Sequence, residues 1–280
     1  AKRARRIQAA AASSGGRRAS ASTSSSRAAA GSGSTSSADS SSASARARCQ
    51  STAAAPATCE YETAYYCANV DADPDRTSGR VLWLDTLRHS YVDLEDPTYL
   101  EFRYAQIFGA VLDTHLPEGP ANSLSIGGGG FTFPRYVATI RPGGLNTVLE
   151  IDPAIVDIAE KELGLDTATL DIRTGDARVT LRDAPIGSYD VVIGDAFGGP
   201  AVPWHLTTKE FAEEFASRLT PTGFYVLNLI DYPPLGFARA QTATLAAVFD
   251  QPLPLSILFW CYFVPSHILN KQRHPHWMLF

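Results

Sequence analysis

Four consecutive glycines, Gly127–Gly130, follow a short apolar run and precede an apolar stretch with helical spacing. Glycines have no Cβ, so the backbone can turn tightly and approach a ligand closely. The N-terminus of the following helix then offers free N–H groups to polar ligand atoms. The same run also fits a flexible turn, so its function depends on the acids that come after it.

Two acids follow at the ends of the next two apolar runs. Glu150 lies 23 residues after Gly127, near the ~20-residue offset at which an acid reaches a ribose. Its carboxylate can accept hydrogen bonds from both ribose hydroxyls. Asp176, within Gly175–Ala177, can accept from an adenine amino group, although capping of the next helix is an equally good role. Glu150 and Asp176 therefore suggest a nucleoside site.

A third acid, Asp195, comes directly after the apolar run Tyr189–Gly194. This is the edge at which open α/β sheets bind their ligands, and a carboxylate there can take a proton from an attacking group. The Gly- and Pro-rich loop after it can pack over a substrate. Further along, ordinary packing is favoured over a lid role for Trp204, and we assign no role to His205.

The elements that position these acids alternate along the chain. The expected strands are Ser123–Ile126, Thr147–Ile151, Thr169–Thr174, Asp190–Ile193 and Gly223–Leu229. The expected helices are Phe133–Ile140, Pro153–Leu163 (with Asp152 as its N-cap), Asp176–Arg182, Thr208–Leu219 and Leu235–Phe249. Strict succession of strand and helix implies a parallel sheet with helices on both faces, a doubly wound α/β domain over residues 96–250.

A small β domain is expected before it, over residues 57–95. Tyr61–Val70 and Val81–Tyr91 are rich in apolar and aromatic residues and flank a polar stretch, as in a hairpin or small sheet. Asp96 then resembles an N-cap followed by Pro97 at the first helical position, and the apolar spacing as far as Leu112 is helical.

The two ends of the chain have a different composition. Residues 1–56 contain nine Lys and Arg and one acid, and are otherwise mostly Ala, Ser, Gly and Thr, so we expect disorder. The same composition suits a transit peptide to a chloroplast or mitochondrion, or a low-complexity tail of a cytoplasmic protein. Residues 251–280 show no clear hydrophobic periodicity. We expect them to form either a short antiparallel end to the sheet or an aberrant, irregular tail.

Composition excludes several classes of protein. Residues 57–280 contain 15 basic and 28 acidic residues. This negative charge argues against a nucleic-acid partner and is compatible with a cationic substrate. The longest apolar run, residues 253–264, is too short to span a bilayer. The four cysteines (Cys49, Cys59, Cys67 and Cys261) show neither metal-ligand spacing nor a disulfide framework, and we expect thiols.

Taken together, these motifs resemble the spermidine synthase family, the polyamine aminopropyltransferases, and its divergent spermidine-synthase-like branch in particular. The resemblance covers about residues 60–249. It rests on the segments Gly127–Gly129, Leu149–Asp152, Gly175–Ala177, the Asp195 loop with Gly199–Ala201, and the N-terminal segments Glu62–Tyr66 and Arg80–Asp85.

The resemblance implies a Rossmann-like fold of the S-adenosylmethionine-dependent methyltransferase type, a homodimer, and no metal. It implies transfer of an aminopropyl group from decarboxylated S-adenosylmethionine to an amine such as putrescine. Gly127, Gly128 and Gly129 would face the nucleoside, Glu150 the ribose, and Asp176 with Ala177 the adenine. Asp195 would orient and deprotonate the attacking amine, since a sulfonium donor needs alignment and a base rather than a metal.

Several positions depart from the family. Gly130 and Gly198 stand where its members usually have aspartates, and His89 stands where they usually have glutamine. Tyr65 aligns with a substrate-facing stretch. Two acids that would hold a cationic amine are thus absent, so two alternatives stay open: a methyltransferase using S-adenosylmethionine, and a non-catalytic nucleoside-binding relative. A dinucleotide oxidoreductase is disfavoured because Thr132 replaces the third fingerprint glycine.

Overall fold

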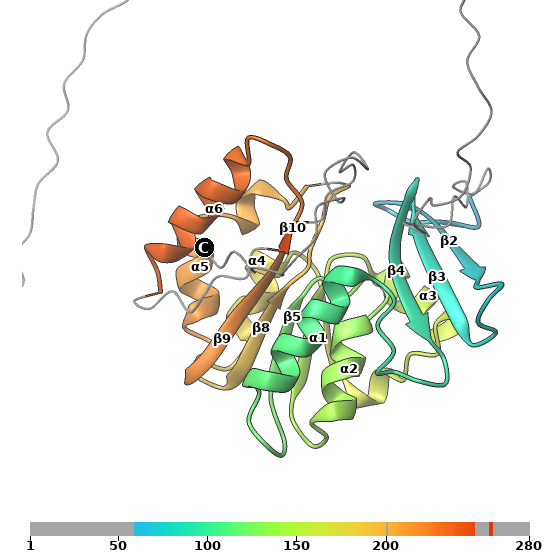
Figure 1. Cartoon of the computed structure of the whole chain (residues 1–280), viewed down its shortest axis with the longest axis horizontal. Helices are drawn as coiled ribbons and strands as arrows, with labels where there is room; N and C mark the ends of the chain where they lie inside the picture. Colours follow the sequence, from blue (N-terminus) through green and yellow to red (C-terminus); the bar gives the residue numbers. More distant parts are fainter. Residues whose placement is uncertain (1–58, 200, 250–257, 260–280) are drawn as a thin grey trace, which may run out of the picture. The chain divides into compact units, whose positions relative to one another are not determined.

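The computed structural model describes residues 59–199, 201–249 and 258–259, which form two sheets (Figure 1). The predictions for residues 1–56 and for most of 251–280 lie outside this range. The first sheet is antiparallel and has the order β1-β2-β3-β4. Its strands are β1 (Tyr61–Glu62), β2 (Cys67–Ala72), β3 (Gly79–Leu84) and β4 (Leu87–Asp93).

The second sheet is parallel and has the order β10-β9-β8-β5-β6-β7. Its strands are β5 (Ser123–Ile126), β6 (Asn146–Glu150), β7 (Asp171–Thr174), β8 (Tyr189–Gly194), β9 (Leu219–Leu229) and β10 (Leu258–Phe259). Every residue of β5 and β6 is buried, as expected for central strands covered on both faces. The predicted doubly wound α/β fold is confirmed.

Helices cover both faces of this sheet. They are α1 (Arg103–His115), α2 (Thr132–Ile140), α3 (Pro153–Glu162), α4 (Ala177–Thr180), α5 (Lys209–Ala216) and α6 (Gly236–Ala246). Short 3-10 turns are η1 (Thr167–Thr169), η2 (Leu181–Asp183) and η3 (Trp204–Leu206). Helices α4, α5 and α6 share a core with Leu124, Ile126 and Val192 on one face, and α1 and α2 pack against Val191 and Ile193 on the other.

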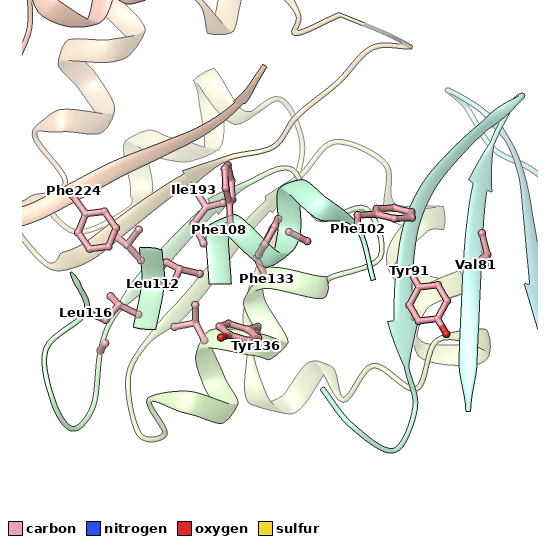
Figure 2. Packing of buried hydrophobic residues seen from close by; sticks show 14 of the residues in the cluster. Val81, Tyr91, Phe102, Phe108, Leu112, Leu116, Phe133, Tyr136, Ile193 and Phe224 are labelled. Carbon is pink, nitrogen blue, oxygen red and sulfur yellow. The ribbon is translucent and has the colours of Figure 1, made fainter. Parts of the chain in front are cut away.

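The first sheet is attached to the α1–α2 side of the second. Val81 of β3 and Tyr91 of β4 belong to the same core cluster as Phe108 of α1 and Phe133 of α2 (Figure 2). Helix α3 packs its apolar side against Leu82 and other residues of the first sheet. A continuous core therefore fixes the first sheet beside the carboxyl ends of the parallel strands.

The start of α1 differs from the prediction. The helix begins at Arg103, whereas the Asp96-Pro97 pattern predicted a start at Pro97. Asp96 instead closes a local turn, in which its Oδ1 accepts from the backbone N–H of Thr98 at 2.9 Å. An aspartate side chain makes the same bond in a turn as at a helix N-terminus, so the pattern did not distinguish the two. By contrast, Asp152 caps α3 by accepting from Ala154 N, as predicted.

Two further expectations are corrected. Cys59 and Cys67 form a disulfide, where thiols had been expected; the antiparallel pairing of β1 with β2 brings their Cα atoms to 5.3 Å. In the C-terminal segment, β10 pairs with β9 in parallel, where an antiparallel finish had been one of the options.

Within the part of the chain that the structure describes, no helix is both long and apolar enough to cross a bilayer.

Candidate active site

A cleft lies at the carboxyl ends of β5 and β8, where the strand order reverses direction. This is the switch point at which open α/β sheets bind their ligands. The cleft has a volume of about 600 Å³, part of it open to solvent. The predicted site residues that line it are Gly127, Gly129, Glu150, Asp176, Ala177 and Asp195; Gly128 lines a smaller pocket next to it.

Gly127 makes the first turn of the loop after β5. Its φ is +95°, and a Cβ at this position would lie 2.7 Å from the carbonyl oxygen of Asp195. The left-handed conformation and the close approach both require glycine. The loops after β5 and β8 therefore touch at the floor of the cleft.

The glycine loop is held by hydrogen bonds to the protein. Both Gly128 N and Gly129 N donate to Glu150 Oε2, at 2.7 and 3.2 Å. Gly130 N donates to Ser90 Oγ at 3.0 Å. Gly127 N and Phe131 N donate to backbone carbonyl oxygens within the same region. The N–H groups of Gly127 through Phe131 therefore all have acceptors within the protein. The free N–H groups were expected at the N-terminus of the next helix, α2, which begins at Thr132.

Glu150 is buried and anchors this loop. Besides the two glycine N–H groups, its Oε1 accepts from Asp152 N at 2.9 Å. Burial raises the pKa of the Glu150 carboxyl, although these three backbone donors lower it. A carboxylate has about four lone-pair sites, so with three donors bound the side chain can still accept from one ribose hydroxyl.

Asp176 lies at the N-terminus of α4 and caps it. Its Oδ1 accepts from Arg178 N at 2.8 Å, which bears out the capping role. Its Oδ2 lies 3.3 Å from Nε2 of His205. His205, to which no role was assigned, thus lines the cleft and contacts the acid expected to read adenine. The two residues are 29 positions apart, and only the fold of the loop after β8 brings them together.

Asp195 stands at the other end of the cleft. Asn228 Nδ2 of β9 donates to its Oδ1 at 2.8 Å, and the Tyr104 hydroxyl of α1 donates to its Oδ2 at 3.3 Å. Burial raises the pKa of the Asp195 carboxyl to about 7, against the lowering effect of these two donors. A carboxyl with a pKa near neutrality is suited to general-base catalysis.

The smaller pocket adjoins the cleft beside Asp195. The two share His89, Gly127, Gly129 and Asp195, and the smaller pocket also contains Ser90, Tyr104, Ser125, Gly128, Thr132, Phe133, Pro134 and Ile193. His89 Nδ1 lies 2.9 Å from Ser90 Oγ. Burial lowers the pKa of His89 to about 4, so its imidazole is neutral at physiological pH.

The two glycines found where acids were expected differ in the space around them. A Cβ at Gly130 would lie 2.6 Å from Ser90 Cβ, so no side chain fits there without a shift of the backbone. A Cβ at Gly198 would meet only Pro203 Cγ, at 3.8 Å. The packing of Ser90 thus explains Gly130, and nothing in the structure requires Gly198.

Four residues near the site were not predicted to act there. Tyr104 and Asn228 hold Asp195, His89 joins the two pockets, and Tyr66 lines the cleft and donates its hydroxyl to the carbonyl oxygen of Phe197 at 2.9 Å. Tyr65, the predicted neighbour, is about half exposed and is absent from the lining of the cleft. Both tyrosines lie in the turn between β1 and β2, where Thr63 Oγ1 accepts from the N–H groups of Tyr65 and Tyr66. The sequence identified this segment, but Tyr66 rather than Tyr65 lines the cleft.

In the described part of the chain, no group of three or more His, Cys, Asp and Glu side chains could hold a metal ion.

The fold and the position of the cleft define a Rossmann-like protein of the S-adenosylmethionine-dependent methyltransferase type, with an antiparallel N-terminal sheet. The crystal structure of a probable spermidine synthase from Corynebacterium glutamicum matches with a TM-score of 0.63 and 32% identity, over 68% of this chain and 70% of that one. The chain belongs to the spermidine synthase (polyamine aminopropyltransferase) family.

Comparison with curated proteins gives partial matches. The polyamine aminopropyltransferase of Vibrio vulnificus is 33% identical over 155 residues, which cover 54% of this chain and 49% of that protein. The human eEF1A lysine and N-terminal methyltransferase is 28% identical over 197 residues, 64% of this chain and 28% of that protein. The chain thus spans about half the length of its curated relatives, or less. No protein-family model matches it.

Proposed function

We propose that this protein is an aminopropyltransferase that moves the aminopropyl group of decarboxylated S-adenosylmethionine to an amine; putrescine is the acceptor that the family suggests. The observation that supports this most is the convergence of Glu150, Asp176 and Asp195 on one cleft beside Gly127 and Gly129. In this proposal Glu150 holds the ribose, Asp176 the adenine, and Asp195 the attacking amine.

Asp195 supplies the base. Its carboxylate accepts a proton from the ammonium group of the acceptor, which frees the nitrogen lone pair. That lone pair forms a bond to the aminopropyl carbon next to sulfur, the C–S bond breaks, and its electron pair stays on sulfur as methylthioadenosine. A pKa of about 7 makes Asp195 a stronger base than an ordinary aspartate while leaving about half of it ionised at pH 7.

The glycine loop favours a donor that lacks a carboxylate. All five N–H groups from Gly127 through Phe131 have partners within the protein. The residues that line the smaller pocket include no lysine or arginine. The α-carboxylate of S-adenosylmethionine would therefore lose water beside Asp195 without gaining a cationic partner, whereas the decarboxylated donor carries no such group.

A methyltransferase remains the second candidate, because relatives named as methyltransferases share part of this sequence. The same nucleoside contacts would serve S-adenosylmethionine, and Asp195 would then deprotonate a methyl acceptor.

One assay distinguishes the candidates. Purified protein is incubated with decarboxylated S-adenosylmethionine and an amine, and in parallel with S-adenosylmethionine. We expect methylthioadenosine in the first reaction and its loss in Asp195→Asn. Formation of S-adenosylhomocysteine alone would favour the methyltransferase. Binding of methylthioadenosine without any turnover would leave a non-catalytic nucleoside-binding protein.

A further inference from the structure

The turn η3 forms part of the cleft wall beside Asp176, where the proposed function, on which this inference rests, places the adenine. Pro203, His205 and Leu206 line the cleft together with Asp176 and Ala177. Leu206 also packs against a core cluster, but no residue of η3 is fully buried. Because apolar packing holds this turn only in part, its polar contacts are needed to fix its position.

Arg178 of α4 supplies these polar contacts. Its Nη1 donates to the carbonyl oxygen of His205 at 2.7 Å, and to Oγ1 of Thr208, the N-cap residue of α5, at 3.0 Å. Both acceptors are neutral oxygens, and a charged donor makes such bonds stronger than they are between two neutral groups. One guanidinium therefore fastens both the end of η3 and the start of α5 to α4.

The same arginine also orients the carboxylate of Asp176. Its backbone N–H donates to Asp176 Oδ1 at 2.8 Å. On the other side of the carboxylate, Nε2 of His205, the residue whose carbonyl the guanidinium holds, lies 3.3 Å from Oδ2. A ring nitrogen that faces a carboxylate this closely carries its proton, because two facing lone pairs repel each other. Each carboxylate oxygen has about two lone-pair sites, so Oδ2 can still accept from the amino group of a base.

We infer that Arg178 is a positioning residue for the base of the nucleoside: acting through His205, it holds the Asp176 carboxylate in the orientation that prefers an aminopurine to an oxopurine. Arg178 itself is not among the residues that line the cleft. An oxopurine presents a carbonyl lone pair where adenine presents its amino group, so a fixed carboxylate repels it. A carboxylate that can turn is able to accept from the ring N–H of the oxopurine instead, and it discriminates less.

Two nucleosides test this: methylthioadenosine, and methylthioinosine, which has an oxo group in place of the amino group. Their affinities for the full chain are measured by calorimetry. Wild type should prefer methylthioadenosine, and Arg178→Met should weaken its binding by about tenfold and narrow the preference. Arg178→Lys keeps the charge and can make one of the two bonds, so it should lie between them. Arg182→Met, at an exposed arginine that also contacts an acid, is the control and should match wild type.

A double-variant comparison tests whether Arg178 acts through His205. His205→Ala removes the imidazole but leaves the backbone carbonyl that accepts from Arg178. If the imidazole transmits the effect, Arg178→Met should change the ratio of the two affinities much less in His205→Ala than in wild type. A purely structural role for Arg178 would lower stability in both backgrounds and leave the ratio unchanged below the melting temperature.

The inference is overturned if wild type and a folded Arg178→Met have the same base preference, or if wild type has none. It is also overturned if the ratio changes equally with and without the His205 imidazole. If Arg178→Met does not melt cooperatively, Arg178→Lys and His205→Ala give the same comparison. Wild type that binds neither nucleoside would overturn the proposed function as well, whereas binding without release of methylthioadenosine from the donor would contradict only the proposed transfer.

Discussion

Asn228 Nδ2 donates to Asp195 Oδ1 at 2.8 Å, so a residue of β9 orients the proposed base that follows β8. The bond favours the ionised carboxylate and opposes the effect of burial on its pKa. Asn228 is itself buried, and its position on the neighbouring parallel strand is set by the register of Val226 with Ile193. The protonation state of the base therefore depends on the pairing of two strands.

The first prediction concerns the dependence of rate on pH. Asp195 must be ionised to accept a proton, so kcat/KM should rise with pH through the pKa of about 7 in the free protein. Asn228→Ala removes a donor that lowers this pKa. The rise of kcat/KM in this variant should therefore occur at a pH about one unit higher than in wild type. A pH–rate profile of both proteins measures the shift. If kcat/KM rises at the same pH in both proteins, Asp195 is not the titrating base.

The second prediction concerns stability. The pKa of Asp195 is about 7 in the folded protein and near 3.8 when exposed, so folding binds a proton between these values. Stability should therefore fall as pH rises from about 4 to 7, and it should stay reduced above 7. Asp195→Asn removes the buried charge and should raise the free energy of unfolding at pH 8 by about 1–3 kcal/mol, with little effect at pH 4. Urea unfolding at pH 4 and pH 8 measures this change in the free energy of unfolding, and Asp157→Asn, at an exposed position, is the control.

The third prediction concerns nucleoside affinity. Glu150→Gln replaces one carboxylate oxygen with an N–H₂ group, which faces either the glycine N–H groups or Asp152 N. Loss of a charge-assisted acceptor should weaken binding of methylthioadenosine by about 10- to 100-fold. Calorimetry on this variant and on the exposed Glu62→Gln provides the comparison. Equal affinities in wild type and Glu150→Gln would remove Glu150 from the site.

The fourth prediction separates backbone strain from steric contact. Gly127 and Gly187 both have positive φ, but a Cβ at Gly187 would meet nothing within 4 Å, whereas one at Gly127 would lie 2.7 Å from Asp195 O. Gly187→Ala should cost about 1 kcal/mol of stability, the usual penalty for this conformation. Gly127→Ala should cost at least about 2 kcal/mol more and should abolish nucleoside binding. Equal melting temperatures would contradict the close contact.

The fifth prediction concerns the loop after β8. The Tyr66 hydroxyl donates to Phe197 O, the carbonyl two residues after Asp195. Tyr66→Phe keeps the ring and removes this bond, so the loop should become more mobile and KM should rise by about 3- to 10-fold. Protection of the loop amides from hydrogen exchange should fall in the same variant. Tyr65→Phe is the matched control, because Tyr65 is half exposed and is not among the residues that line the cleft.

The order of elements and the donor side of the site followed from local patterns. The glycine run and the acids Glu150, Asp176 and Asp195 each lie at the end of a strand, and a parallel sheet brings such ends to one edge. Sequence spacing alone therefore led to residues that line one cleft. The predicted roles of these residues stay predictions until their variants are measured.

What the sequence did not reveal depends on contacts between distant segments. Tyr104 is 91 residues from Asp195, and Ser90 is 40 residues from Gly130. In the sequence, each of these residues only continues the pattern of its own helix or strand. Nothing near them in the sequence indicated a role in the site. The hydrogen bonds that hold the glycine loop have the same origin, since the acceptors Glu150 and Ser90 come from other strands.

The structural role of Glu150 affects how the sequence of this protein can evolve. The carboxylate proposed to bind ribose also fastens the glycine loop and the turn into α3. Selection on folding alone would therefore preserve it, even in a descendant that no longer transfers any group. Asp195 is under the opposite pressure, because its buried charge costs stability. In a lineage that loses catalysis, Asp195 should be replaced early and Glu150 late, and this order distinguishes active from inactive relatives.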